Sequence, residues 1–326
     1  MNLIRRIACA ATVAAIACTA VAQDPQYPTK TIRLIIPSTP GGGTDFIART
    51  LSVKLAESAG AGWTLVPENR PGAAGTLGLA ETARAKPDGY DLVIGQTANV
   101  SLAPWLMKLS FDPAKDLTPV ALAVEAPMVL AVAENSPYKT WADLLAFAKA
   151  NPSKPLNFGT SGTGSVAQVA AEQIQDKSGF KLQHVPYKGS APALADLMGG
   201  HLDLAGTSLA SALPLLQSGK IRALAVTSAK RATALPNAPA LSELGYPGFN
   251  MVEWYGVFGP ANLPPAIADR LNAEVNKVLQ RPEVRTVILG QGQEPRPESR
   301  AAFAAMVKSD NQTSQAIIAK AGIKLE

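Results

Sequence analysis

The chain has 326 residues, of which 47% are hydrophobic, and it carries a formal net charge of +5. This hydrophobic share supports substantial buried cores, and the length exceeds what one compact core usually holds, which predicts two domains. The small, dispersed charge excludes the usual kind of nucleic-acid-binding protein, because such proteins gather basic residues on one face.

Residues 1–22 have the pattern of a secretory signal peptide, with two arginines before an apolar stretch over 7–20 and small residues up to Ala22. The stretch is short for a membrane span, and no later segment offers about 18 uninterrupted apolar residues. Cleavage after Ala22 would remove both cysteines, Cys9 and Cys18, and would lower the net charge from +5 to +3. We therefore expect a periplasmic protein without disulfides.

The first part of the mature chain predicts strands that alternate with helices. The run 32–36 indicates a buried strand, and a glycine-rich segment leads from it to a helix over 46–55, where apolar residues recur at helical spacing. Further strands are predicted over 63–66 and 91–94, each followed by a loop and a helix. This alternation is typical of an α/β fold with a doubly wound, mostly parallel sheet and helices on both faces. Ligands bind such sheets at the carboxyl ends of the strands.

The segment 120–132 is almost continuously apolar, and the nearby prolines disfavour a helix, so it predicts a long strand that passes between the two domains. Beyond it the alternation of strands and helices resumes, and the strand 221–226 is expected to return the chain to the first domain. The predicted division gives domain 1 residues 23–123 plus 229–326 and domain 2 residues 124–228, with crossovers near 120–127 and 224–230.

Two glycine-rich segments, Pro40 to Asp45 and Gly159 to Ser165, each lie between a predicted strand and a predicted helix. Glycine lets backbone N–H groups approach a ligand closely, and the N–H groups and dipole of a helix start favour negative charge. Each segment could instead be a tight turn, with Asp45 or Ser165 completing the helix start. Two such segments in separate halves predict a pair of facing anion cradles. Asp45 either caps its helix or accepts a donor group of the ligand.

A catalytic interpretation has few residues to use, because the mature chain has no cysteine and only two histidines, His184 and His201. Residues 159–163 lack the last glycine of the Gly-x-Ser-x-Gly motif, and neither glycine-rich segment has the lysine of a phosphate loop. Metal-ligand spacing is also missing from the sequence. We therefore expect no catalytic residue, no metal and no cofactor. A secreted serine hydrolase using Ser161 or Ser165 is the alternative from another class.

In their order along the chain, eight motifs resemble those of the periplasmic substrate-binding proteins of tripartite tricarboxylate transporters, the Bug or TctC family. The likeness covers nearly the whole mature chain. The chain departs from the family in having Ser38-Thr39 where an aromatic residue is common, and Gln168 where a histidine is common. The motifs are Tyr27-Pro28, Pro40 to Asp45, Asn69 to Gly75, Lys86 to Tyr90, Gly159 to Ser165, Val185 to Gly189, Leu224 to Ser228 and Glu253 to Gly256.

The resemblance implies a monomeric, two-domain Venus-flytrap protein of the type II periplasmic-binding-protein fold. Such a protein closes on a small carboxylate, such as a di- or tricarboxylate or an aromatic acid, and delivers it to the permease subunits of the membrane transporter. A solute sensor that docks on a signalling partner would have the same fold. Trp254 and Tyr255 either line the cleft or pack in the first core. The expected ligand-binding residues are Ser38, Thr39, Gly41, Gly42, Gly43, Asp45, Ala73, Thr97, Ser161, Gly162, Gly164, Ser165, Gly189, Ser190 and Thr207.

Overall fold

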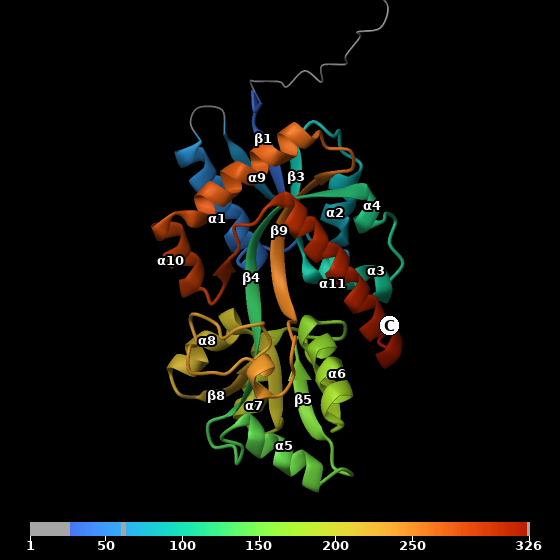
Figure 1. The fold of residues 1–326 in the computed structure, drawn as a ribbon, viewed down its shortest axis with the longest axis vertical. Coiled ribbons are helices and arrows are strands. Elements are labelled where there is room, and N and C mark those ends of the chain that lie inside the picture. The colour runs from blue at the N-terminus through green and yellow to red at the C-terminus, as the bar shows by residue number, and fades with distance from the viewer. Residues whose placement is uncertain (1–26, 60–62, 325–326) are drawn as a thin grey trace, which may run out of the picture.

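A computed structural model of the protein describes residues 27–59 and 63–324, and the predicted signal peptide lies outside these residues. Figure 1 shows an elongated molecule in which two groups of strands and helices are connected by the long strand β4 (Leu117–Ala133). No helix within the described residues is both long and apolar enough to cross a membrane.

The first sheet consists of one group of strands and the first part of β4. In it β1 pairs in parallel with β2 and β3, and β9 lies antiparallel between β3 and β4. The strands are β1 (Ile32–Ile36), β2 (Leu65–Asn69), β3 (Asp91–Gln96), β9 (Val252–Pro260) and β10 (Glu294–Pro295). The helical segments are α1 (Gly43–Ser58), η1 (Ala73–Gly75), α2 (Thr76–Ala83), η2 (Ala98–Leu102), α3 (Ala103–Leu106), α4 (Pro113–Asp116), α9 (Pro265–Gln280), α10 (Pro282–Gly290) and α11 (Arg300–Ala321).

The second sheet consists of the other group of strands and the last part of β4. Here β5 pairs in parallel with β6 and β7, while β7 and β8 both run antiparallel to β4. The strands are β5 (Leu156–Thr160), β6 (Leu182–Pro186), β7 (Leu204–Ser208) and β8 (Ile221–Val226). The helical segments are α5 (Trp141–Ala150), α6 (Val166–Ser178), α7 (Ser190–Met198), α8 (Leu209–Gln217) and η3 (Leu241–Leu244).

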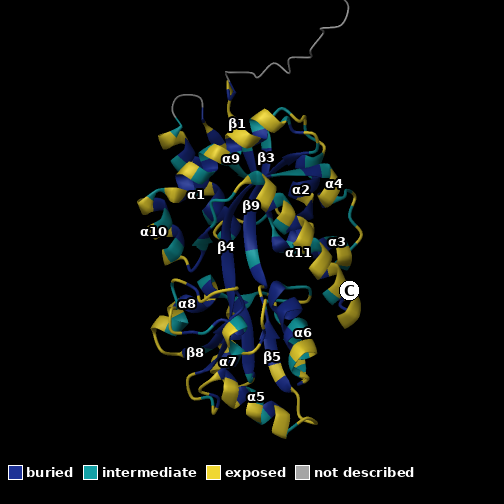
Figure 2. Ribbon diagram, viewed as in Figure 1, coloured by how far each residue is buried: buried dark blue, intermediate teal, exposed yellow. Residues whose placement is uncertain are grey.

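The strand β4 confirms the long apolar strand that its sequence predicts. Its residues up to Pro127 pair with β9, and those from Met128 onward pair with β7 and β8. Almost every residue of the strand is buried, since helices cover both faces, which explains the continuous rather than alternating apolar pattern. Figure 2 shows β4 as a buried strand, while the exposed residues lie mainly on the outer surfaces of the helices.

The pairing register directs the carboxyl ends of both parallel groups toward one another. Gln96, which ends β3, pairs with Tyr255 near the start of β9, on the side where β9 approaches the second sheet. Ser208, which ends β7, pairs with Met128, where β4 enters the second sheet. Because parallel strands share one direction, the ends of β1 and β5 lie at the same two edges. The loops after β1 and β5 therefore lie at the junction of the two sheets.

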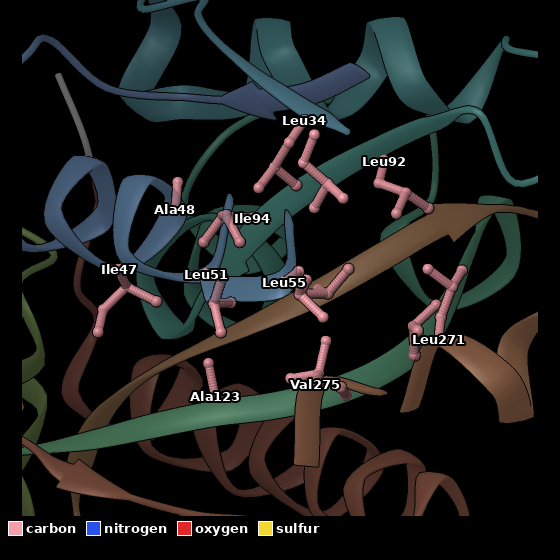
Figure 3. Close-up of a cluster of buried hydrophobic side chains, with 14 of the residues drawn as sticks. Leu34, Ile47, Ala48, Leu51, Leu55, Leu92, Ile94, Ala123, Leu271 and Val275 are labelled. Carbon is pink, nitrogen blue, oxygen red and sulfur yellow. The ribbon is translucent and has the colours of Figure 1, made fainter. Parts of the chain in front are cut away.

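The first core lies beneath α1 and α9, on one face of the first sheet. Ile47, Leu51 and Leu55 of α1 recur at helical spacing and pack with Leu271 and Val275 of α9 over the strands (Figure 3). On the opposite face, residues of β9 pack with α11 in a second cluster of the same sheet. The helix start that carries the first glycine-rich segment is thus anchored by a well-filled core.

The second core gathers side chains from β4, β5 and α6, and it also takes in two later segments of the chain. Tyr246 and Phe249 pack there beside Trp141, and the chain enters the first sheet only at Val252, where β9 begins. Ile318, near the end of α11, lies in the same core. This packing differs from the predicted return near 224–230, because the apolar side chains of 241–251 cover the second core before the chain crosses.

Candidate functional site

The first loop, residues 37–43, connects β1 to α1 with a backbone that needs glycine at one position. Gly41 has φ +92°, a left-handed conformation that side chains rarely adopt. Gly42 is the N-cap of α1, and it has no side chain that could accept from the amides of the first turn. A Cβ atom added at Gly41 or Gly42 would meet nothing within 4 Å. The first turn of α1 therefore presents its amides with open space in front of two glycines.

Asp45 holds the first loop in place from inside the protein. One of its carboxylate oxygens accepts from the backbone N–H of Gly41 at 3.1 Å, and the carboxylate also accepts from Arg49 and Asn69 at 3.0 Å. Asn69 donates in turn to the carbonyl of Ser38. Burial works to raise the pKa of Asp45, but these hydrogen bonds outweigh it and hold the pKa below its ordinary value. Of the two predicted roles, the contacts support the structural one.

The second loop, residues 161–165, leads from β5 to α6 and contains two glycines with positive φ, Gly162 at +146° and Gly164 at +74°. The hydroxyl of Ser165 accepts from the backbone N–H of Gln168 and caps α6. The side-chain carbonyl of Gln168 accepts from the N–H of Gly164 at 2.7 Å. The residue that stands where the family often has histidine thus shapes the second loop.

Three further predicted residues lie next to these loops. The N–H of Gly189 donates to the carbonyl of Ser161. This bond attaches the loop before α7 to the second loop, and Ser190, the first residue of α7, follows directly. Ala73 has φ +46° in η1, the turn before α2. A Cβ atom added at Gly75, the last residue of the same turn, would lie 2.9 Å from the carbonyl oxygen of Pro37. The turn containing Ala73 therefore borders the first loop.

Thr97, Thr207 and Ser38 differ in how their hydroxyl groups are used. Thr97 is fully buried, and its hydroxyl accepts from the N–H of Trp254 and donates to the carbonyl of Val252, so it supports β9. The buried hydroxyls of Thr207 and Ser38 have no hydrogen-bond partner among the described residues. Thr39, beside Ser38, is exposed. We conclude that Thr97 acts on the strand rather than on the space between the loops.

Two residues that the sequence left out or left open, Gln293 and Tyr255, border the first loop. A Cβ atom at Gly43 would lie 3.0 Å from the hydroxyl of Tyr255 and 3.1 Å from Nε2 of Gln293. Gln293 is 2% exposed, and its side-chain carbonyl has no partner among the described residues. Tyr255 packs in the first core, and Glu253 lies two residues before it on β9. Side chains alternate between the two faces of a strand, and applying this alternation to the Glu253 to Gly256 motif could have placed Glu253 on the same face as Tyr255.

The turn before β10 links the first loop to the second sheet. Gln293 lies against Gly43, and a Cβ at the adjacent Gly292 would come within 3.0 Å of the side chain of Leu209, the first residue of α8. Thr233 donates to Glu294 at 2.7 Å, on the same side. The start of α8, directly after Thr207 and Ser208, therefore approaches the first loop through this turn.

The hydrolase alternative finds little support in the contacts of its two candidate serines. The hydroxyl of Ser165 caps α6, and the ring nitrogen Nε2 of His184 lies 2.7 Å from the hydroxyl of Thr160. Burial lowers the pKa of His184. Among the described residues, no hydrogen bond joins a histidine to Ser161 or Ser165, and no cluster of three or more His, Cys, Asp or Glu side chains could hold a metal ion.

Comparison with known proteins identifies the family. Residues 47–323 match the model described as the tripartite tricarboxylate transporter family receptor. The protein BugT of Bordetella pertussis is 33% identical, over 92% of each chain. A protein from a Pseudomonas species, encoded between tcbD and tcbE, is 34% identical over 90% of this chain and 86% of its own.

Solved structures agree with this assignment. A periplasmic transporter is 35% identical, with a TM-score of 0.77 over 92% of this chain and all of its own. The periplasmic binding protein BugD is 31% identical with a TM-score of 0.73, and MatC from Rhodopseudomonas palustris with bound malate is 31% identical with a TM-score of 0.72. These neighbours confirm the predicted α/β periplasmic-binding-protein fold. The chain belongs to the receptors of the tripartite tricarboxylate transporter family.

Proposed function

We propose that this protein binds a small organic carboxylate between its first and second loops in the periplasm and delivers it to the permease subunits of a tripartite transporter. The convergence of the two glycine-rich loops at facing sheet edges carries the proposal. Each loop ends at the start of a helix longer than ten residues, where backbone amides and the helix dipole favour an anion. The protein acts as a receptor without catalysis.

Two structural neighbours support the class of ligand. A protein from R. palustris that is 33% identical to this chain has been solved with adipate, and MatC has been solved with malate. Both ligands are dicarboxylates. We extend this chemistry to the present chain because the family and the fold are shared.

The energetics of such a site are sufficient without an arginine. A hydrogen bond to a charged group contributes about 1.5–3 kcal/mol, and micromolar affinity requires about 8 kcal/mol net. Three or four donors from each loop exceed this value even after the ordering costs of binding. We assign the donors to the amides of Gly42, Gly43, Ser161 and Thr163 and to the hydroxyls of Ser161 and Thr163, with the hydroxyls of Ser38 and Thr207 as further candidates. The amides of Gly41, Gly162, Gly164 and Ser165 already donate within the protein.

A valine at position 42 tests the proposal most directly. Gly42 has φ −84°, and a Cβ there meets nothing within 4 Å, so the protein accepts a side chain that would obstruct the amides. Loss of two amide hydrogen bonds should reduce carboxylate affinity about a hundredfold or more. Calorimetric titration of the purified mature protein with mono-, di- and tricarboxylates and aromatic acids would measure this.

The matched control is Gly290→Val, at an exposed glycine that also has nothing within 4 Å of its Cβ and lies at the end of α10. We expect unchanged affinity in this control and unfolding temperatures close to wild type in both variants. Carboxylate binding that survives Gly42→Val, or binding of neutral sugars in place of acids, would contradict the proposed site.

Delivery to the permease needs a separate test. Deleting the gene should abolish uptake of the acid that binds in vitro, and the wild-type gene should restore uptake while the Gly42→Val gene should not. Normal uptake in the deletion strain would contradict a role in transport and favour a sensor that docks on a signalling partner.

A further inference from the structure

Glu253 differs from every other residue of β9, because it alone is not buried. Its neighbour Trp254 faces α11, where the indole N–H donates to Asp310 at 3.0 Å. Side chains alternate along a strand, so Glu253 lies on the opposite face, together with Tyr255. Tyr255 lies beneath α1 with its hydroxyl against Gly43. Glu253 thus lies on the α1 face, two residues closer to the second sheet.

The pairing register places Glu253 between the starts of two helices. Glu253 pairs with Ala126 of β4, which belongs to the first core beneath α1. Two residues further along β4, Met128 packs in the second core with Val166, the first residue of α6. Glu253 therefore lies at the junction at which the first and second loops end, and its carboxyl group accepts from the hydroxyl of Tyr255, which lies against Gly43.

The interactions of Glu253 with the described residues include a hydrogen bond but not a salt bridge. Burial raises its pKa, and the hydroxyl of Tyr255 opposes this by donating to it. The pKa of Tyr255 is itself raised well above its ordinary value, mainly by burial, so this hydroxyl stays protonated and remains a donor. When Glu253 is ionised, no salt bridge of the described residues compensates its charge.

We propose that Glu253 selects ligands that carry a hydrogen-bond donor, an ammonium or a hydroxyl group, next to the carboxylate held by the two loops. The inference rests on the proposed function of these loops. A ligand with only carboxylates would place its negative charge beside Glu253 as the site loses water, whereas a donor on the ligand would satisfy the side chain. An ammonium compensates the charge fully and a hydroxyl only in part. We therefore expect affinity to fall from amino acids to hydroxy acids to unsubstituted acids.

Ligand series that share one carbon skeleton test this order. The series are aspartate, malate and succinate; glutamate, 2-hydroxyglutarate and glutarate; and phenylglycine, mandelate and phenylacetate. In the series that wild type binds, we expect the affinity for the amino acid to exceed the affinity for the unsubstituted acid by about tenfold or more. This is the effect of one charge-assisted hydrogen bond. Glu253→Gln should reduce this ratio about tenfold, while Glu253→Asp should retain the preference.

The pH dependence of the affinity for unsubstituted acids also tests the inference, because a purely structural role of Glu253 would not change it. Binding an unsubstituted acid beside Glu253 raises the pKa of this carboxyl further, so binding takes up a proton. The affinity of wild type for that acid should therefore rise as the pH falls toward the raised pKa that Glu253 has in the free protein, by up to about tenfold per unit. Glu253→Gln should show no such rise. Glu172→Gln, at another carboxyl whose pKa is raised by burial, should behave as wild type.

The outcomes separate this inference from the proposed function. Binding of acids with the same order and the same pH dependence in wild type and Glu253→Gln would overturn the role of Glu253 and leave the carboxylate site intact. Failure of every acid to bind wild type would overturn the proposed function, and the inference with it. If Glu253→Gln did not fold, the comparison of Glu253→Asp with wild type and the wild-type pH dependence would decide.

Discussion

Two acidic residues near the first loop have opposite surroundings, and these surroundings separate their roles. Asp45 is buried among three hydrogen-bond donors, and these hydrogen bonds outweigh the effect of burial and lower its pKa. Glu253 is of intermediate exposure as a residue, burial raises its pKa, and no salt bridge of the described residues includes it. A carboxylate held by three protein donors stabilises the loop, whereas Glu253, which accepts from the hydroxyl of Tyr255, retains acceptor positions for a donor of the ligand.

Replacing Asp45 by asparagine should destabilise the protein by about 1–3 kcal/mol at neutral pH, since charged hydrogen bonds to Gly41, Arg49 and Asn69 are lost. The folded-state pKa of Asp45 is lowered, so its stabilisation is present above the unfolded value of about 3.9 and is lost as the pH falls through the folded value. Urea unfolding at several pH values should show the two proteins converging in acid.

The control for Asp45 is Asp269→Asn, which removes a surface pair with Arg300 and should cost at most about 0.5 kcal/mol. An equal loss of stability in both variants would show that the network around Asp45 contributes no more than a surface pair.

At the scale of elements, the close packing of α11 on β9 depends on a glycine in the strand. In β9, a Cβ added at Gly256 would lie 2.3 Å from Cζ of Phe303 on α11, so the helix approaches the strand over a missing side chain. Trp254 and Phe258 flank the same ring. The approach of α11 to β9 depends on this glycine, and the opposite face of β9 carries Glu253 and Tyr255.

We predict that Gly256→Ala destabilises the protein by about 1–3 kcal/mol, because the added methyl group overlaps the ring of Phe303. Adding Phe303→Leu to this variant should recover part of the loss, although Phe303→Leu alone is destabilising. Denaturant unfolding of the single and double variants would measure the coupling. Strictly additive effects would show that the strand, not the contact, requires the glycine.

At the scale of the whole molecule, three segments connect the two sheets: β4, β9 with the residues before it, and α11. Phe303 and Val307 of α11 pack against the first sheet, whereas Ile318 packs in the second core. Figure 1 shows this last helix running from the first group of elements toward the second. A motion of one sheet relative to the other must therefore be accommodated by the end of α11 as well as by the two strands.

Ile318→Ala should cost about 2–5 kcal/mol despite its place near the end of the chain, because Ile318 is 4% exposed in the second core. Gln315→Ala, on the exposed face of the same helix, should change the free energy of unfolding by less than about 0.5 kcal/mol. Equal stability of the two variants would indicate that the end of α11 does not contribute to the second core.

Much of the fold and of the loop positions follows from short stretches of sequence. The apolar run 120–132 lies within β4 (Leu117–Ala133), as predicted. The glycine-rich segments connect a strand to a helix, although Gly43 to Asp45 already belong to α1 and Gly159 and Thr160 still belong to β5. Glycines at 41, 162 and 164 have positive φ, a requirement that acts within a single residue. Features of this kind are local, so neighbouring residues are enough to reveal them.

By itself the sequence determined the alternating fold, the two loops and the likeness to a receptor family. Only the tertiary structure decided that Asp45 supports the loop through Asn69, that Thr97 supports β9 at a sequence separation of more than 150 residues, and that 241–251 cover the second core. It also placed Gln293 beside the first loop and Glu253 opposite Ala126 of β4. The physical reason is that hydrogen bonds and packing between distant segments depend on how the sheets are assembled, which no short stretch of residues specifies.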